Sequence, residues 1–147
     1  MNVARPGGKG KPGLLQPECS FQPGTQFSLN LRVFAHDRVL ENVCQRAEQL
    51  RRRLATDCTG LRHVGDVRQW GLMVGIELVR NRDTREPYPA AARIGMRTIK
   101  EARTQGVILR PLSNTIVLMP PLCITEAQVD LLCDVTRDAI TAATEMA

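Results

Sequence analysis

One segment of this 147-residue chain places a large apolar side chain at every second position. The apolar residues of this alternation are Leu72, Val74, Ile76 and Leu78. Because successive side chains of a strand point to opposite faces of a sheet, this period predicts a half-buried β-strand over residues 72–79. The apolar face of such a strand has to be covered by another layer of secondary structure.

Helical patterns lie on both sides of this strand. Apolar residues recur every three or four positions over residues 39–55, and this spacing predicts a helix. We expect a second helix over residues 91–104, with Gly106 just past its end. A third helix opens at Thr125, where Gln128 gives the spacing of a capping box. The expected buried faces of the first and third helices comprise Val39, Leu40, Val43, Cys44, Ala47, Leu50, Leu54, Val129, Leu132, Cys133, Thr136 and Ile140.

Two short strands are expected between the second and third helices. The sequence predicts a strand over residues 107–109, a turn over residues 111–114, and a return strand over residues 115–119 that ends at Pro120. The order of elements is therefore helix, strand, helix, strand, strand, helix, without an internal repeat. This order predicts an α+β fold, with a mostly antiparallel sheet and helices on one of its faces.

The first thirty residues differ from the rest of the chain. They contain four prolines and five glycines and show neither a helical nor a strand period. Such a composition buries too little apolar surface to offset the entropy lost on ordering, so we expect residues 1–30 to form a disordered or irregular arm. A single folded domain then occupies residues 31–147. The GGKGKPG stretch of the arm lacks the spacing of a phosphate-binding loop.

Charge and composition exclude several classes of protein. The net charge is +5, but basic and acidic residues are interleaved after residue 30, as on a solvated surface. Only 3% of the residues are aromatic, which argues against a stacking platform for nucleic acid. We interpret the RRR run at residues 51–53 as a complement to the helix dipole rather than a nucleic-acid patch. No apolar run approaches the ~20 residues of a membrane span, and no secretory signal is visible.

The cysteine pattern favours a reducing compartment. The five cysteines include no CxxC pair, and the chain has only two histidines, so the sequence offers few ligands for a zinc site. We expect Cys44 and Cys133 to be buried as small apolar side chains. A cytoplasmic protein follows from this pattern.

No self-contained catalytic motif such as HExxH, GxSxG or a Walker loop stands out in the sequence. The most unusual segment is GVILRPLSN (residues 106–114), in which Arg110 ends an apolar strand immediately before the rigid Pro111. A guanidinium in this position can hold a carboxylate in a bidentate fork. An arginine that only covers a surface turn is an equally good interpretation of these residues alone.

Three segments resemble class III pyridoxal-phosphate-dependent aminotransferases. They are VGDVRQWGLMVGIELVRNRDTREPYP (residues 64–89), RIGMR (93–97) and GVILRPLSNTIVLMPPLCIT (106–125). The resemblance covers about three-quarters of the chain, residues 31–140, and is closest to the adenosylmethionine-dependent enzymes of biotin synthesis. It implies the small C-terminal domain of a fold-type-I enzyme, homodimeric in this family. Such an enzyme transfers an amino group from S-adenosylmethionine to the keto acid 8-amino-7-oxononanoate.

The resemblance also implies what this chain lacks. In the family, a lysine of the large domain forms the Schiff base with pyridoxal phosphate, and an acidic residue there holds the pyridine nitrogen. Lys9 and Lys11 lie in the arm and Lys100 in a predicted helix, so no lysine has the family's context. We therefore expect a fragment or truncated gene product, with residues 1–30 unrelated to the family. Alone, it should be inactive and should bind neither pyridoxal phosphate nor a metal.

The family resemblance carries one residue role over to this chain. Arg110 matches the arginine that contacts the keto-acid carboxylate in the biotin-pathway enzymes, and it is the single substrate-binding residue that we assign. Ornithine-type relatives have a further arginine before the PP pair, at the position of Val117 here. This difference favours a long keto acid with an apolar chain over an α-amino acid.

Three alternatives stay open. An ω-amine:pyruvate transaminase keeps a similar arginine and is the closest rival. A folded remnant or interaction module would retain the domain without catalysis. A basic binding module would use the arm and residues 51–53, although interleaved charge and scarce aromatic residues count against nucleic acid as a partner, and no membrane partner is expected.

Overall fold

The described part of the chain contains the predicted order of helix, strand, helix, strand, strand and helix, with four additional elements at residues 23–36, 64–70, 86–87 and 90–92. The computed structural model describes residues 23–145, and the side chains from residue 28 onwards. The helices are α1 (Pro23–His36), α2 (Val39–Asp57), α3 (Ile94–Thr104) and α4 (Glu126–Glu145), with a 3₁₀ helix at Ala90–Ala92. The strands are β1 (Val64–Trp70), β2 (Met73–Asn81), β3 (Glu86–Pro87), β4 (Arg110–Leu112) and β5 (Thr115–Leu118).

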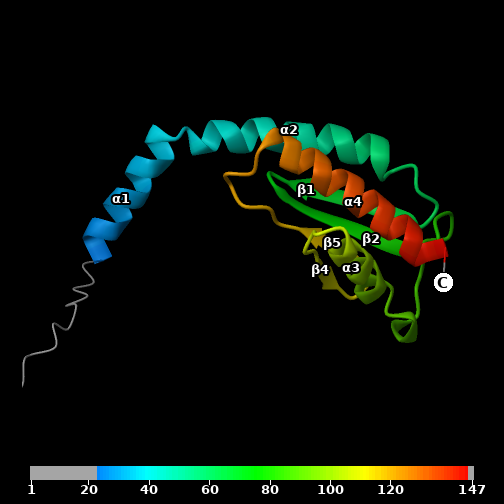
Figure 1. Cartoon of the computed structure of the whole chain (residues 1–147). Coiled ribbons are helices and arrows are strands. Elements are labelled where there is room, and N and C mark those ends of the chain that lie inside the picture. The colour runs from blue at the N-terminus through cyan, green and yellow to red at the C-terminus, as the bar shows by residue number, and fades with distance from the viewer. Residues whose placement is uncertain (1–22, 146–147) are drawn as a thin grey trace, which may run out of the picture.

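The strands form one antiparallel sheet in the order β1-β2-β5-β4, and β3 pairs with the end of β2. Figure 1 shows α2 and α4 side by side over the sheet, whereas α1 projects away from it. None of the described helices is long and apolar enough to span a membrane.

The sheet is buried on one face only. Val74, Ile76 and Leu78 of β2 are at most 1% exposed, and so are Ile116 and Leu118 of β5. These side chains meet the buried residues of α2, α3 and α4 in a single apolar core. The expected α+β fold, with an antiparallel sheet and helices on one face, is confirmed.

The helix over residues 126–145 begins as the sequence predicts. The backbone N–H of Thr125 donates to Oε1 of Gln128 at 3.0 Å, and the N–H of Gln128 donates to Oγ1 of Thr125 at 3.3 Å. This reciprocal pair is the expected capping box, and it satisfies two N–H groups at the start of α4.

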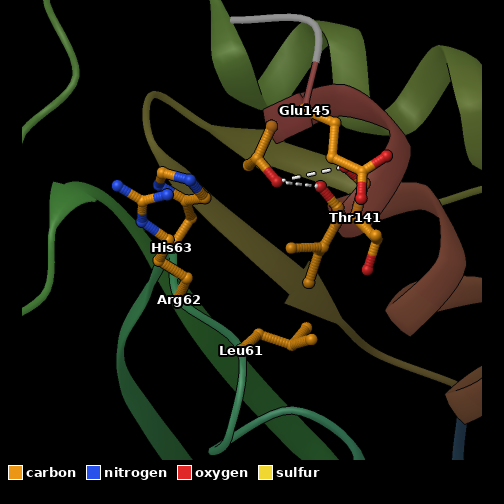
Figure 2. Close-up of a pocket in the computed structure, with 7 residues that line it drawn as sticks. Leu61, Arg62, His63, Thr141 and Glu145 are labelled. Atoms are coloured by element: carbon orange, nitrogen blue, oxygen red, sulfur yellow. Dashed lines mark hydrogen bonds between the residues drawn. The ribbon is translucent and has the colours of Figure 1, made fainter.

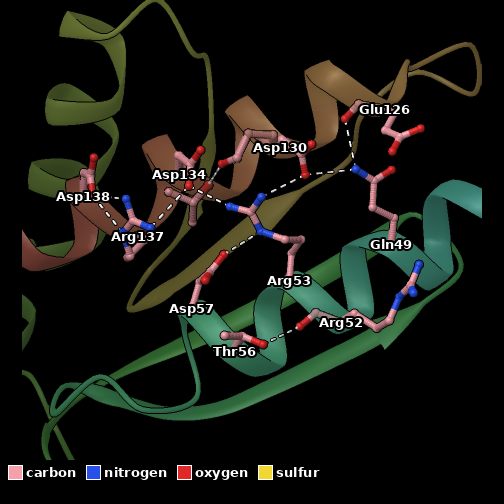
Figure 3. Close-up of polar contacts among 12 residues, drawn as sticks. Gln49, Arg52, Arg53, Thr56, Asp57, Glu126, Asp130, Asp134, Arg137 and Asp138 are labelled. Atoms are coloured by element: carbon pink, nitrogen blue, oxygen red, sulfur yellow. Dashed lines mark hydrogen bonds and ion pairs between the residues drawn. The ribbon is translucent and has the colours of Figure 1, made fainter.

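A charged cluster joins α2 to α4 (Figure 3). The guanidinium of Arg53 contacts Asp57 of its own helix at 2.9 Å, and Asp130 and Asp134 of α4 at 2.9 and 2.7 Å. The helix-dipole interpretation of residues 51–53 is wrong, because α2 continues to Asp57 and has no basic residue in its last turn. Arg53 instead connects the two helices by charge-assisted hydrogen bonds.

Strand β1 was not apparent from the sequence pattern. Val64 is buried, but polar and charged side chains occupy both faces of the strand, and the register of pairing with β2 shifts between Val64 and Asp66. A bulge moves later residues to the opposite face, so a search for strict alternation misses such a strand.

Helix α1 corrects the boundary of the expected arm. The helix begins at Pro23, so the expectation of an irregular segment is wrong for residues 23–30. Proline fits the first turn of a helix, because its fixed φ is helical and an N–H group there has no helical acceptor. The rest of the expected arm, residues 1–22, lies outside the described residues.

The β4–β5 hairpin is shifted from its expected position. The strand expected over residues 107–109 is wrong, because β4 begins at Arg110. The expected turn over residues 111–114 is also too long, since only Ser113 and Asn114 lie between the two strands. Ser113 has a positive φ of 55°.

The two-residue turn determines the register of this hairpin. It pairs Leu112 with Thr115 and Arg110 with Val117. Pro111 is tolerated inside β4 because β4 is an edge strand of the sheet, where one side of the backbone has no partner strand.

The two cysteines expected to be buried differ. Cys133 is buried as expected, but Cys44 is exposed. The reason is that the buried residues of α2 begin at Ala47, whereas Val43 is only partly buried against the core and Leu40 in the first turn is 66% exposed.

A substitution at Gly95 tests the packing of α3 against the hairpin. A Cβ atom added to Gly95 would lie 2.2 Å from the carbonyl oxygen of Ser113. Because that oxygen moves only if the turn moves, we expect Gly95→Ala to lower the free energy of unfolding by about 1–3 kcal/mol in urea titrations. Gly75→Ala is the control, since its Cβ would meet only Cγ2 of Thr115 at 3.5 Å. Equal stability of both variants would contradict this packing.

Two buried thiols predict a loss of stability at alkaline pH. Burial raises the pKa of Cys58 from 9.0 to about 11 and that of Cys133 from 9.0 to about 12. The unfolded chain therefore loses these protons first, so their contribution is complete below pH 9 and falls as the pH rises towards 11–12. We expect each thiol to lower the free energy of unfolding by about 1.4 kcal/mol per pH unit between pH 9 and its folded-state pKa of about 11 for Cys58 or about 12 for Cys133. Cys133→Ala should remove about half of this slope, and an unchanged slope would refute the assignment.

Candidate functional site

Arg110, the substrate-binding residue expected from the family resemblance, is the first residue of the edge strand β4 and is exposed. Its guanidinium makes no hydrogen bond or ion pair with any residue that the structure describes. Arg53, by contrast, is surrounded by three carboxylates. The charge of Arg110 is therefore available to a carboxylate from outside the described residues.

A row of paired residues crosses the sheet from Arg110. Arg110 pairs with Val117 of β5, Val117 with Gly75 of β2, and Gly75 with Arg68 of β1. Directly paired residues of neighbouring strands point to the same face of a sheet. Their neighbours along the strands, such as Ile116, point into the core. The row therefore lies on the face without helices, which we call the open face.

Val117 determines the charge of the row beside Arg110. The register places Val117 directly opposite Arg110, so an arginine at this position would set two guanidinium groups side by side. With valine, this end of the row carries one positive charge next to an apolar side chain. Gly75, the next residue in the row, adds no side chain, which leaves the open face flat there.

Large apolar side chains lie exposed around this row. Trp70 and Met73 pair at the β1–β2 turn and are 85% and 53% exposed, and Leu112 of β4 is 66% exposed. An arginine with such surroundings suits a ligand that combines a carboxylate with an apolar chain.

A cavity of about 390 Å³, lined mostly by apolar residues, adjoins the start of β4. Its lining includes Leu109, which precedes Arg110, and Val117, which pairs with Arg110. Leu131 and Leu132 of α4 line it as well. Arg110 itself does not line this cavity, but the residue before it and the residue paired with it do.

The described residues provide no enclosed lysine for a Schiff base with pyridoxal phosphate. Lys100 is the one lysine among residues 23–145, and it is exposed on α3. The described residues also contain no group of three or more His, Cys, Asp or Glu side chains able to hold a metal ion.

Two cavities with charged residues in their lining lie near the end of α4. One, of about 470 Å³, has Arg62 and His63 on one side and Thr141 and Glu145 of α4 on the other (Figure 2). The second, of about 540 Å³, shares Arg62 and His63 with the first.

The second cavity contains functional candidates that the sequence analysis did not identify. Arg62, Arg80 and Arg97 line it together with Tyr88. They come from a loop before β1, the end of β2 and the first turns of α3. No spacing signal links residues that lie 17 or 18 positions apart on different elements, so only the fold reveals their proximity.

Known proteins similar to this chain are aminotransferases. A family model described as "Aminotransferase class-III" matches residues 27–140. The adenosylmethionine-8-amino-7-oxononanoate aminotransferase of Nitratidesulfovibrio vulgaris is 50% identical over 116 residues, which are 79% of this chain and 21% of the relative. A taurine–pyruvate aminotransferase of Bilophila wadsworthia is 31% identical over 119 residues, or 76% of this chain and 25% of the relative.

A solved structure shows the same similarity. The crystal structure of adenosylmethionine-8-amino-7-oxononanoate aminotransferase from Methanocaldococcus jannaschii superposes with a TM-score of 0.73 at 40% identity. The match covers 76% of this chain and 25% of that one. The chain thus spans between a fifth and a quarter of the length of the curated relatives described here.

The position of Lys100 makes a prediction about cofactor binding. Because this lysine is exposed on a helix, we expect incubation with pyridoxal phosphate followed by borohydride reduction to label no single lysine preferentially. Mass spectrometry of tryptic peptides measures the label, and Lys100→Arg is the control. Stoichiometric labelling of Lys100 that disappears in this variant would contradict the prediction.

Proposed function

The chain belongs to the class-III aminotransferase family, and we propose that it forms the small C-terminal domain of a biotin-pathway transaminase. The proposed reaction moves an amino group from S-adenosylmethionine to 8-amino-7-oxononanoate. Identity supports this choice, because the relative named for this reaction is 50% identical, whereas the taurine–pyruvate enzyme is 31% identical. The observation that carries the proposal is the unpaired Arg110 beside Val117 on the open face.

In this proposal Arg110 binds the carboxylate of the keto acid. A guanidinium matches a carboxylate in a two-bond fork, and Pro111 fixes the backbone that follows it. The apolar side chain of Val117 and the cavity lined by Leu109 would contact the aliphatic chain of the substrate. Arg110 thus orients the substrate and takes no part in proton transfer.

Pyridoxal phosphate would be held by residues that this chain does not supply. The amino-transfer chemistry belongs to the cofactor, and the described residues include no lysine suited to it. We therefore propose that residues 23–145 are inactive alone and work within a longer, homodimeric, cytoplasmic enzyme. A folded remnant without catalysis would share the fold but would not need Arg110.

An ω-amine:pyruvate transaminase is the second candidate function. The 31% identity to the taurine–pyruvate enzyme supports this candidate. A pyruvate transaminase would also need an arginine to bind the carboxylate of its substrate, so Arg110 fits either function. The substrates differ in length: pyruvate has no apolar chain to occupy the cavity of about 390 Å³ next to Arg110.

A chimera tests the proposed role of Arg110. Residues 27–140 of this chain would replace the matching segment of the Nitratidesulfovibrio vulgaris relative, and amino transfer would be measured with 8-amino-7-oxononanoate and with pyruvate. A charged hydrogen-bonded contact contributes about 1.5–3 kcal/mol, so we expect Arg110→Ala to lower kcat/KM for the keto acid by roughly one to two powers of ten.

The control for this experiment is Arg103→Ala, which removes an exposed arginine of α3 that makes no ion pair with a described residue. It should leave kcat/KM unchanged. If Arg110→Ala also leaves kcat/KM unchanged, Arg110 is an ordinary surface residue. A chimera that uses pyruvate but not 8-amino-7-oxononanoate would favour the second candidate function.

A further inference from the structure

Three arginines from separate elements surround one cavity on the helix-covered side of the sheet. Arg62, Arg80 and Arg97 line this cavity of about 540 Å³ together with Tyr88 and His63, and we call it the arginine cavity. Arg80, near the end of β2, lines this cavity together with Arg97 of α3 and Thr144 of α4, so the cavity lies on the side opposite the row that contains Arg110.

Most of the positive charge in the arginine cavity is not neutralised by the described residues. Arg62 and Arg97 make no ion pair with any of them. Arg80 makes one long contact of 3.4 Å with Glu86, and both side chains are more than half exposed. Exposed pairs of this kind are weak. By contrast, Arg53 has three close carboxylate partners.

Tyr88 and His63 give the cavity a fixed polar wall. Tyr88 is 7% exposed, and its hydroxyl lies 2.9 Å from Nδ1 of His63. Nδ1 also lies 3.2 Å from the carbonyl oxygen of Val79. The side-chain amide of Asn114 donates to the carbonyl oxygen of Tyr88 at 2.8 Å, which ties this loop to the β4–β5 turn. The wall is therefore in place before any ligand arrives.

The arginines produce a positive potential at this wall. Burial raises the pKa of the Tyr88 phenol, and the charges of Arg97, Arg62 and Arg80 oppose this rise. All three guanidinium groups are thus close enough to stabilise negative charge at the Tyr88 hydroxyl. An anion in the arginine cavity would receive the same stabilisation.

Helix α3 adds to this potential. Its N-cap residue is Arg93, which makes no side-chain capping bond, and Ala92 and Arg97 on either side of the N-cap line the cavity. The start of an α-helix carries partial positive charge and unpaired N–H groups. This dipole acts in the same direction as the guanidinium groups.

Acidic residues near the arginine cavity set a requirement on the ligand. Glu145 lines the adjoining cavity rather than this one, across from Arg62 (Figure 2). Glu86 contacts Arg80 from the exposed side. A singly charged anion has to compete with these carboxylates, so a doubly charged group with several acceptor oxygens is favoured.

We propose that the arginine cavity binds a phosphate group, either as free phosphate or as part of a phosphomonoester. Arg62 and Arg97 bind the phosphate oxygens through their unpaired guanidinium groups, and Arg80 exchanges its long contact with Glu86 for the ligand. Phosphate carries the double charge and the acceptor geometry that arginine forks match. The proposal concerns this chain by itself and does not depend on the proposed function.

Titration of the ¹⁵N-labelled chain tests the proposal. Inorganic phosphate, glycerol 3-phosphate and acetate are added separately at constant ionic strength, and amide shifts are followed by NMR. We expect saturable shifts at Arg62, His63, Tyr88 and Arg97 with either phosphate compound, and at least tenfold weaker binding of acetate. Tighter binding of the ester would identify a phosphomonoester ligand, and equal or weaker binding of the ester would identify free phosphate.

Two double variants distinguish specific phosphate binding in the arginine cavity from nonspecific attraction of phosphate to positive charge. The double variant R62Q/R97Q should weaken phosphate binding at least tenfold. The matched control R52Q/R103Q removes the same charge from two other arginines without ion-pair partners and should change binding less than twofold. Urea unfolding of both verifies that they fold. Shifts that do not saturate, equal losses in both double variants, or equal affinity for acetate and phosphate would each overturn the proposal.

Discussion

One face of the sheet is buried under α2, α3 and α4, and this burial determines the direction of the side chains that alternate with the buried ones on β2 and β5. Ile76 and Ile116 are completely buried, so their neighbours on the same strands are forced to the opposite face. Gly75 and Val117 lie on that open face, and strand pairing places Arg110 in line with them. The position of the candidate substrate residue thus follows from core packing, although Arg110 itself contributes nothing to the core.

Two local features keep Arg110 in this position. The two-residue turn at Ser113 and Asn114 fixes the register of β4, and a one-residue slip would turn Arg110 toward the helices. Helix α3 supports the turn from the covered side, where Gly95 allows close approach to the carbonyl oxygen of Ser113. Asn114 also binds the loop that carries Tyr88, so the same turn connects the open face to the arginine cavity.

The sequence predicted those parts of the fold that produce a regular pattern. The alternation around Ile76 gave β2, the three-and-four spacing gave α2 and α4, and the capping box at Thr125 was correct in both hydrogen bonds. Strand β1 was not predicted, because a bulge and polar residues on both of its faces interrupt the alternation of apolar and polar residues. Burial of Cys44 was misjudged because periodicity shows the apolar stripe of a helix but not where the neighbouring layer ends.

The candidate functional residues divide in a similar way. Arg110 was identifiable because a contiguous motif surrounds it and resembles a known family, but its pairing with Val117 required the register of β4 and β5. The arginine cavity depends on residues from β2, α3 and a loop, which no local pattern connects. The contacts of Arg53 with Asp130 and Asp134 were hidden for the same reason.

We propose that the open face presents Arg110 to a substrate carboxylate. A crystal structure of the chimera with 8-amino-7-oxononanoate bound would measure this most directly. We predict both oxygens of the substrate carboxylate within about 2.7–2.9 Å of the guanidinium nitrogens of Arg110, with the aliphatic chain against Val117. A substrate carboxylate held by other residues, with the Arg110 side chain in solvent, would contradict the account.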